Sequence, residues 1–229
     1  MFVQPLSELI GAKGWTTTVA DLTQRAVTQS DSAAVDILVE RLGGPERVQA
    51  VLTARALSGI SFDRDEKHLQ SDVLGITWSP ALVEADLFAR VRAAVPRAKQ
   101  LAAYEAYRQD TRDTATPAGM VELLLRLARC ELLSRASTTW LRETMQAKTT
   151  GTKRLKAGLA PNWTLGHKTG TSSSFEGLAA ATNDVGLLTA PNGETFAVAV
   201  FLGDSRADED ARDAAIAAVA RAIVESYRL

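Results

Sequence analysis

The hydrophobic pattern changes near Trp163, and this change constrains the fold more than any other feature of the sequence. Before it, apolar residues recur at helical spacing, which predicts amphipathic helices. After it come three runs that read as strands because glycine, proline and asparagine bound them: 163–169, 184–189 and 195–202. Ala190-Pro191-Asn192-Gly193 predicts a hairpin turn between the last two. The alanine-rich stretch at 207–228 predicts a long helix that covers the sheet.

Helix start and stop signals divide the first two thirds of the chain. Threonines at 16–18 predict the cap of one helix. Gly43-Gly44 followed by Pro45 predicts the end of a second helix and the start of a third. Two more helices are expected, one from Pro117 and one over Ser137–Met145.

Residues 71–110 fit this pattern least well. One apolar periodic stretch ends at Pro96 and another runs through Tyr107, so we expect a helical insertion at 71–110. The chain is then one domain over 1–229, with a helical block and an antiparallel sheet flanked by a C-terminal helix. This is an α/β (α+β) arrangement.

The composition excludes several function classes. Hydrophobic residues make up 46% and the net charge is −1, so nothing favours a nucleic acid or an anionic membrane as partner. Apolar stretches are broken well before the roughly 18 residues that a membrane span needs. The single cysteine, Cys130, rules out an internal disulfide, and we place it on a buried helix face. Two histidines are too few for a zinc cluster without carboxylate help.

A short motif ends the first predicted strand. Lys168-Thr169-Gly170-Thr171 places a cation and two hydroxyls where glycine lets a ligand approach the backbone closely. Such a group can hold a carboxylate beside an open cleft. By itself the motif is more often a surface turn.

Ser30-Asp31-Ser32 opens a predicted helix. The plain interpretation is an N-cap, in which a side chain accepts the first helical N–H groups. The functional alternative is a serine presented into a cleft to relay a proton.

Glu66 follows Arg64-Asp65 in a polar segment. It is either a solvated loop carboxylate or a general base that activates water. Arg64 and Asp113 would then pair to close a loop around it.

The order and combination of these motifs resemble class A serine β-lactamases. The elements are Ser-Asp-polar, a glutamate after Asp-Arg, Arg-Asp-Thr-x-Thr-Pro, and Lys-Thr-Gly. The resemblance runs from about Trp15 to the C-terminus, apart from the insertion. It implies a hydrolase with a β-lactam as small-molecule substrate, no metal or organic cofactor, a monomer, and a periplasmic or secreted location for the full-length protein. No signal peptide occurs in this sequence.

The resemblance also implies roles for the first group of residues. Ser30 would pass a proton to the β-lactam nitrogen, and Glu66 would activate the deacylating water. Gln70 replaces the family's usual asparagine and would orient that water. Ser32 also stands where the family has an asparagine, which leaves the contacts to the substrate amide open.

On the predicted strand, Lys168 and Thr169 would bind the substrate carboxylate and support Ser30 electrostatically. Gly170 would leave room for the substrate. Thr171 would offer its backbone N–H to the oxyanion hole.

The insertion leaves two alignments open. Residues 71–112, forty-two in all, separate Gln70 from Asp113, far more than is normal in the family. Glu105 and Gln109 keep the same four-residue spacing much nearer Asp113. We prefer Glu66 because Asp63-Arg64 precedes it in the family manner.

The family's nucleophile motif, Ser-x-x-Lys, is absent from this sequence, which is a further difference from the family pattern. No serine here is followed by lysine at the third position, and the family position would fall before Met1. We therefore expect a front-truncated β-lactamase without the N-terminal strands and the nucleophile helix, and a sheet with an unpaired edge. The alternative is a non-catalytic remnant or penicillin-binding module. The context of Glu66 argues against a D,D-peptidase.

Overall fold

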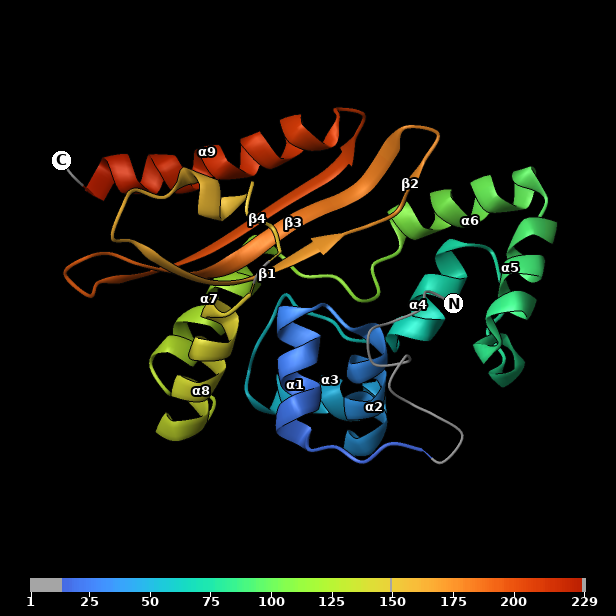
Figure 1. Ribbon diagram of the computed structural model, residues 1–229, viewed down its shortest axis with the longest axis horizontal. Coiled ribbons are helices and arrows are strands. Elements are labelled where there is room, and N and C mark those ends of the chain that lie inside the picture. The colour runs from blue at the N-terminus through green and yellow to red at the C-terminus, as the bar shows by residue number, and fades with distance from the viewer. Residues whose placement is uncertain (1–13, 149, 228–229) are drawn as a thin grey trace. The chain divides into compact units, whose positions relative to one another are not determined.

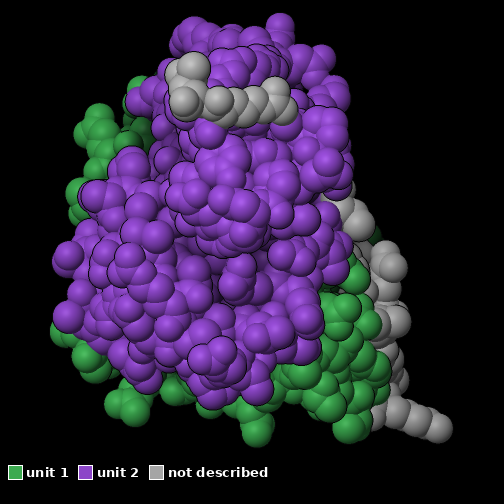
Figure 2. Space-filling view, turned by 90° about the vertical axis from the view of Figure 1, so that its left-hand side faces the viewer, with its two compact units in different colours: residues 1–54, 61–114 green, residues 55–60, 115–229 purple. Residues whose placement is uncertain are grey.

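A computed structural model describes residues 14–148 and 150–227. The chain forms two compact units, coloured separately in Figure 2. Unit 1 comprises residues 1–54 and 61–114, and unit 2 comprises residues 55–60 and 115–229. The single domain expected for 1–229 stays a prediction.

Unit 1 is helical in its described part. Its elements are α1 (Val19–Thr28), α2 (Ser32–Leu42), α3 (Pro45–Ala54), α4 (Glu66–Val73), η1 (Pro80–Val83), α5 (Ala85–Ala94) and α6 (Arg97–Gln109). The expected helix caps are present. The Thr18 side chain caps α1 by accepting a hydrogen bond from the Asp21 N–H, and Gly43 ends α2 with a φ of 101°. Only α4 was not expected, because six of its eight residues are polar and Leu69 and Val73 alone are too few to show a helical apolar period. The Asp65 side chain begins it by accepting from the His68 N–H.

Two small hydrophobic clusters hold unit 1 together. Leu22 and Ala34 join α1 to α2. Ile76, Leu82 and Phe88 form the second cluster, and five partly buried residues pack on it: Leu74, Trp78, Leu87, Val91 and Val95. Fully burying such a side chain stabilises a fold by about 1.5–3 kcal/mol. Residues 71–110 are therefore helical, as expected, and have an apolar cluster of their own.

Unit 2 combines helices with an antiparallel sheet. Its elements are α7 (Pro117–Ala128), α8 (Arg135–Gln146), η2 (Leu155–Gly158), β1 (Thr164–Thr171), β2 (Ser174–Phe175), β3 (Leu178–Thr189), β4 (Thr195–Ser205) and α9 (Glu209–Tyr227). β3 pairs with β1, β2 and β4, all antiparallel. β4 pairs with no other described strand. The expected fold of a helical block plus an antiparallel sheet is confirmed.

The third strand is longer than its sequence pattern predicted. β3 begins at Leu178, six residues before the expected start at Asp184, and the part that was not expected includes the polar residues Thr182 and Asn183. These polar residues masked the strand in the hydrophobic pattern. Thr182 and Asp184 are nonetheless fully buried.

Helices cover both faces of the sheet. α9 and η2 lie on one face, while α7 packs on β4 and α8 on β1 on the other (Figure 1). Leucines 155, 165 and 188 meet Ile216 and Ala220 of α9 in the main core. None of the helices in the described part of the chain is long and apolar enough to cross a membrane.

The position expected for Cys130 is wrong. α7 ends at Ala128, and Cys130 lies in the turn that follows with a φ of 59°. Its side chain is only partly buried. The apolar spacing in the sequence continues beyond Ala128, where α7 ends, and this made Cys130 look like part of the helix.

Gly158 tests the packing of η2 on α9. A Cβ at this position would lie 2.0 Å from the Ala217 carbonyl oxygen and 2.9 Å from the Ala220 Cβ. We expect Gly158→Ala to lower the free energy of unfolding by about 1–3 kcal/mol, since overpacking forces backbone shifts. The measurement is urea denaturation. Gly203→Ala is the control, because its Cβ would meet nothing closer than 3.6 Å. Equal stability of the two variants would contradict this packing.

Candidate active site

The Glu66 carboxylate lies in a closed hydrogen-bonded group with two other expected site residues. Ser32 Oγ donates to Glu66 Oε2 at 3.3 Å, and Gln70 Nε2 donates to the same oxygen at 2.9 Å. Gln70 Nε2 also lies 3.1 Å from Ser32 Oγ. Glu66 and Gln70 are one turn apart on α4, so they share a helix face. The structure brings these three residues of unit 1 together.

Asp36 orients this group and was not predicted from the sequence. It lies one turn after Ser32 on α2 and accepts hydrogen bonds from the Glu66 N–H at 2.7 Å and the Lys67 N–H at 3.2 Å. Two of the N–H groups that a helix start leaves unpaired are thereby satisfied. Burial raises the pKa of the Asp36 carboxyl above its usual range. Its only signal in the sequence is a lone acid inside an apolar helical run.

Arg64 and Asp113 meet despite the forty-two residues between Gln70 and Asp113. Arg64 Nε donates to Asp113 Oδ2 at 2.8 Å. Asp113 Oδ1 also accepts from the Asp63 and Arg64 N–H groups at 2.6 and 2.9 Å. Only 9% of the Arg64 side chain is exposed. The pair ties the two ends of the α4–α6 segment together.

Two further carboxylates extend the pair into a network. Arg64 Nη1 donates to Asp72 at 2.8 Å, and Nη2 lies 3.1 Å from Asp110. Arg112 forms a two-pronged hydrogen bond to Asp110. Arg112, and then the charge of Arg64, hold the pKa of Asp110 at about 2.

This network predicts a stability loss in acid. A carboxyl whose pKa is about 2 when folded and about 4 when unfolded adds stability above pH 4, which is lost as the pH falls from 4 to 2. We expect the unfolding free energy of Asp110→Asn to fall less steeply over this range than that of the unchanged chain. Urea denaturation at pH 4, 3 and 2.5 measures the slope. Asp86→Asn, on the exposed surface of α5, should keep the original slope; if Asp110→Asn keeps it too, the network does not act as described.

Ser30 precedes the buried cap of α2. The Asp31 side chain is fully buried and accepts from the Ala34 N–H at 2.9 Å, so the cap expected for this motif is present. Ser30 itself is exposed and has a φ of 55°. A serine in this left-handed region is strained, by about 1–3 kcal/mol, and such strain clusters at functional sites.

In unit 2, the Lys-Thr-Gly-Thr motif forms the end of β1. Lys168 pairs with Val185 across the ladder, and Thr171 pairs with Thr182. Lys168 Nζ donates to the Thr169 carbonyl at 2.7 Å. Gly170 and Thr171 are exposed, whereas the strand before them is buried. The sheet therefore presents the polar end of a buried strand to solvent.

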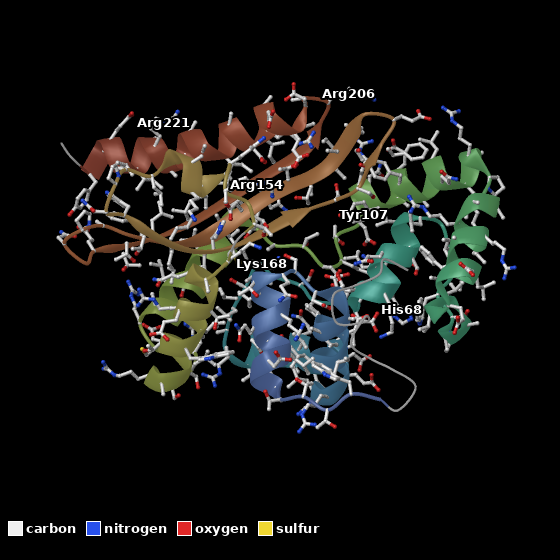
Figure 3. The ribbon with its side chains drawn as sticks, viewed as in Figure 1. His68, Tyr107, Arg154, Lys168, Arg206 and Arg221 are labelled. Carbon is white, nitrogen blue, oxygen red and sulfur yellow. The ribbon has the colours of Figure 1, made fainter. Side chains whose placement is uncertain are left out.

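Arg154 holds that exposed end in place (Figure 3). Its Nη2 donates to Thr171 Oγ1 at 2.8 Å, and its Nη1 donates to the carbonyls of Gly170 and Asn183 at 3.2 and 2.9 Å. Asp213 on α9 balances its charge at 2.7 Å. Both side chains are more than nine-tenths buried. The role of Arg154 was not predicted from the sequence, because nothing in the local pattern distinguishes a buried arginine from a surface one.

A buried histidine–aspartate pair supports β1 from the face that α9 covers. His167 Nδ1 lies 2.8 Å from Asp184 Oδ1, and both residues are almost completely buried. The other Asp184 oxygen accepts from the Leu155 N–H at 3.2 Å. Gly151 lies close against β1, since a Cβ there would lie 2.5 Å from a methyl carbon of Thr169 and 3.3 Å from His167 Cε1.

The rival residues of the other alignment lie elsewhere in unit 1. Glu105 is on α6 and pairs with Arg108 one turn later at 2.6 Å. Its side chain is 43% exposed. Gln109, at the end of the same helix, is exposed.

Comparison with known proteins identifies the family. A model described as the β-lactamase enzyme family matches residues 8–227. The chain belongs to this family. The β-lactamase VEB-1 of Pseudomonas aeruginosa is 30% identical over 210 residues, which are 91% of this chain and 59% of VEB-1. The carbapenem-hydrolyzing β-lactamase KPC of Klebsiella oxytoca is 27% identical over 221 residues, 96% of this chain and 62% of KPC. The chain thus spans about three fifths of these curated relatives.

Solved β-lactamase structures share the fold. The extended-spectrum β-lactamase TLA-3 superposes with a TM-score of 0.77 at 27% identity, covering 98% of this chain and 70% of TLA-3. A class A β-lactamase described as the last common ancestor of Gram-negative bacteria has a TM-score of 0.74 at 35% identity, and the match covers 99% of this chain and 71% of that structure's chain. The resemblance to class A β-lactamases is confirmed.

The buried Arg154 provides a test of how β1 is held in this β-lactamase-family chain. We expect Arg154→Ala to lower the free energy of unfolding by about 3–5 kcal/mol, because Asp213 is left buried without a partner. Arg154→Lys should recover part of this loss, since an ammonium group retains a charge but not the fork of donors. Urea denaturation and amide hydrogen exchange of β1 are the measurements.

Arg221→Ala is the matched control, because Arg221 lies on the exposed side of α9. It should leave both measurements unchanged. If the β1 amides exchange hydrogen no faster in the Arg154→Ala variant than in the Arg221→Ala variant, Arg154 does not hold the strand.

Proposed function

We propose that the protein is a serine β-lactamase that opens the β-lactam amide through an acyl-enzyme, which a water activated by Glu66 then hydrolyses. The observation that carries this proposal is the group formed by Glu66, Ser32 and Gln70. A half-buried carboxylate beside a hydroxyl and an amide has the groups needed to hold a water and take its proton. The family membership supports the same reaction.

The backbone contacts of Glu66 favour it over Glu105 as the base. Asp36 accepts from the Glu66 N–H, and Asp65 caps the same turn, so the start of α4 is held from two sides. A positioned base needs this kind of support, since small displacements cost large factors in rate. Glu105 is instead paired with Arg108 on an exposed helix face.

The remaining roles follow the resemblance. Ser30 passes a proton to the β-lactam nitrogen as the amide bond breaks. Lys168 and Thr169 bind the substrate carboxylate, and the Thr171 N–H donates to the oxyanion. A donor of this kind contributes about 2.7–4 kcal/mol to lowering the barrier. Arg154 supports this arrangement through its contacts to Gly170 and Thr171.

The acyl-enzyme step needs a serine nucleophile, and the 229 residues contain no Ser-x-x-Lys motif. We therefore propose that these residues alone bind β-lactams without turning them over and that the working enzyme includes such a motif. The protein then acts on β-lactam antibiotics in the periplasm or outside the cell, as a monomer. The alternative is a binding module that keeps the family's residues without the reaction.

The test begins with the coding DNA upstream of Met1, read in frame for a Ser-x-x-Lys motif. The longest in-frame product should hydrolyse nitrocefin, and the 229-residue chain should not. Glu66→Gln should reduce turnover by at least about a hundredfold and leave a stable acyl-enzyme visible by mass spectrometry, since deacylation loses its base. Glu105→Gln is the matched control and should keep full activity.

Two results would contradict the proposal. An upstream stop codon or an unrelated upstream sequence would favour the binding module. A longer product that hydrolyses nitrocefin equally well with Glu66→Gln would remove Glu66 from the reaction.

A further inference from the structure

A cavity of about 370 Å³ lies wholly within unit 1, between α4, the segment after it and α6. Small-molecule sites in proteins usually measure about 300–1,000 Å³. None of the residues that we assign to β-lactam chemistry lines this cavity except Arg64, which has a structural role in the loop. The cavity is thus distinct from the group around Glu66.

The charges of the lining favour an anion. Three cations, Arg64, Lys99 and Arg112, face two carboxylates, Asp72 and Asp110. Arg64 contributes little net charge to the cavity, because Asp72, Asp110 and Asp113 all lie within 3.1 Å of its guanidinium nitrogens. Lys99 is the lining cation that none of these carboxylates balances.

Two donors at the cavity are left for a ligand. Arg112 uses Nε and Nη2 on Asp110, so Nη1 has no partner among the described residues. Lys99 lies on α6, one helical turn before Ala103. It likewise makes no ion pair or hydrogen bond with the described part of the chain. An ammonium and a guanidinium are the side chains that best bind carboxylates.

Tyr107 adds a neutral donor (Figure 3). Its hydroxyl has no hydrogen-bond partner within the residues described. Burial raises its pKa above the usual range, so the group keeps its proton and remains a donor at physiological pH. A phenol of this kind complements an oxyanion.

The rest of the lining consists of small or apolar residues and one hydroxyl, that of Thr77: Gly75, Ile76, Thr77, Ala103 and Ala106. Ile76 is buried at one side, and Ala103 and Ala106 present only methyl groups from α6. We propose that this cavity binds a small monocarboxylate, with its carboxylate between Lys99, Arg112 and the Tyr107 hydroxyl and a compact apolar group on Ala103 and Ala106. The site adds a second binding function to the proposed hydrolase and does not depend on that reaction.

Benzoate is the probe, because it combines a carboxylate with one compact apolar ring. The experiment titrates the ¹⁵N-labelled 229-residue chain with benzoate at constant ionic strength and follows backbone amide shifts. We expect saturable shifts confined to residues 72–77 and 99–112. Benzamide, which lacks the charge, and inorganic phosphate, which lacks the apolar group, should each bind at least about fivefold more weakly.

Matched variants separate a site from general anion binding. Lys99→Ala should weaken benzoate about fivefold, whereas Arg90→Ala, which removes an exposed charge from α5, should not. Ala106→Leu should abolish the saturable shifts by filling the cavity. Ala102→Leu, on another exposed side of α6, should leave them unchanged.

Shifts that do not saturate, that scatter over the surface, or that survive Ala106→Leu would overturn the proposal. So would equal affinity for benzoate and phosphate, since the apolar wall would then play no part. Because no β-lactam is used, these results are independent of nitrocefin hydrolysis.

Discussion

The ion pair between Arg64 and Asp113 is the constraint on which most of unit 1 depends. It joins the chain before α4 to the chain after α6. Asp113 also accepts hydrogen bonds from two backbone N–H groups of the segment before α4, those of Asp63 and Arg64. Loop-closure entropy grows slowly, by about 0.6 kcal/mol for each doubling of loop length. The Arg64–Asp113 ion pair can therefore close a segment with two extra helices at a small cost in conformational entropy. The apolar cluster around Leu82 and Phe88 offsets the ordering of those helices.

Unit 2 uses the same device in another setting. Arg154, like Arg64, is more than nine-tenths buried and binds both a carboxylate and parts of a neighbouring backbone. A buried guanidinium is costly to desolvate, so it is stable only when its donors are used. Once they are used, its planar fork restricts the positions of several chain segments at once. In each unit, a buried arginine thus orients a backbone that carries exposed polar residues.

Local patterns predicted the parts of the fold that local physics determines. The capped and periodic helices, the hairpin and the motif at the end of β1 were all readable in this way. α4 was missed because a short polar helix depends on the caps from Asp65 and Asp36, and the second cap comes from another helix. The start of β3 was missed because Thr182 and Asn183 are polar, although Thr182 is fully buried and pairs with Thr171 of β1. Such pairings exist only in the folded chain, so a pattern along the sequence does not contain them.

The same distinction applies to the candidate site. The sequence predicted the residues assigned to the reaction, such as Glu66 and Lys168, because they belong to recognisable motifs. It did not predict the residues that position them, because Asp36 and Arg154 act across the fold.

Ser32 shows what this division of roles implies for specificity. The family has an asparagine at this position, whose amide contacts the substrate, whereas the Ser32 hydroxyl donates to Glu66 and lies within reach of Gln70. The substitution therefore exchanges a substrate contact for a contact to the proposed base. The buried framework around it, from the Asp31 cap to Asp36, does not require the asparagine. In the proposed function, a change at this half-exposed position would alter which β-lactams fit, while the helices that carry it would keep their positions.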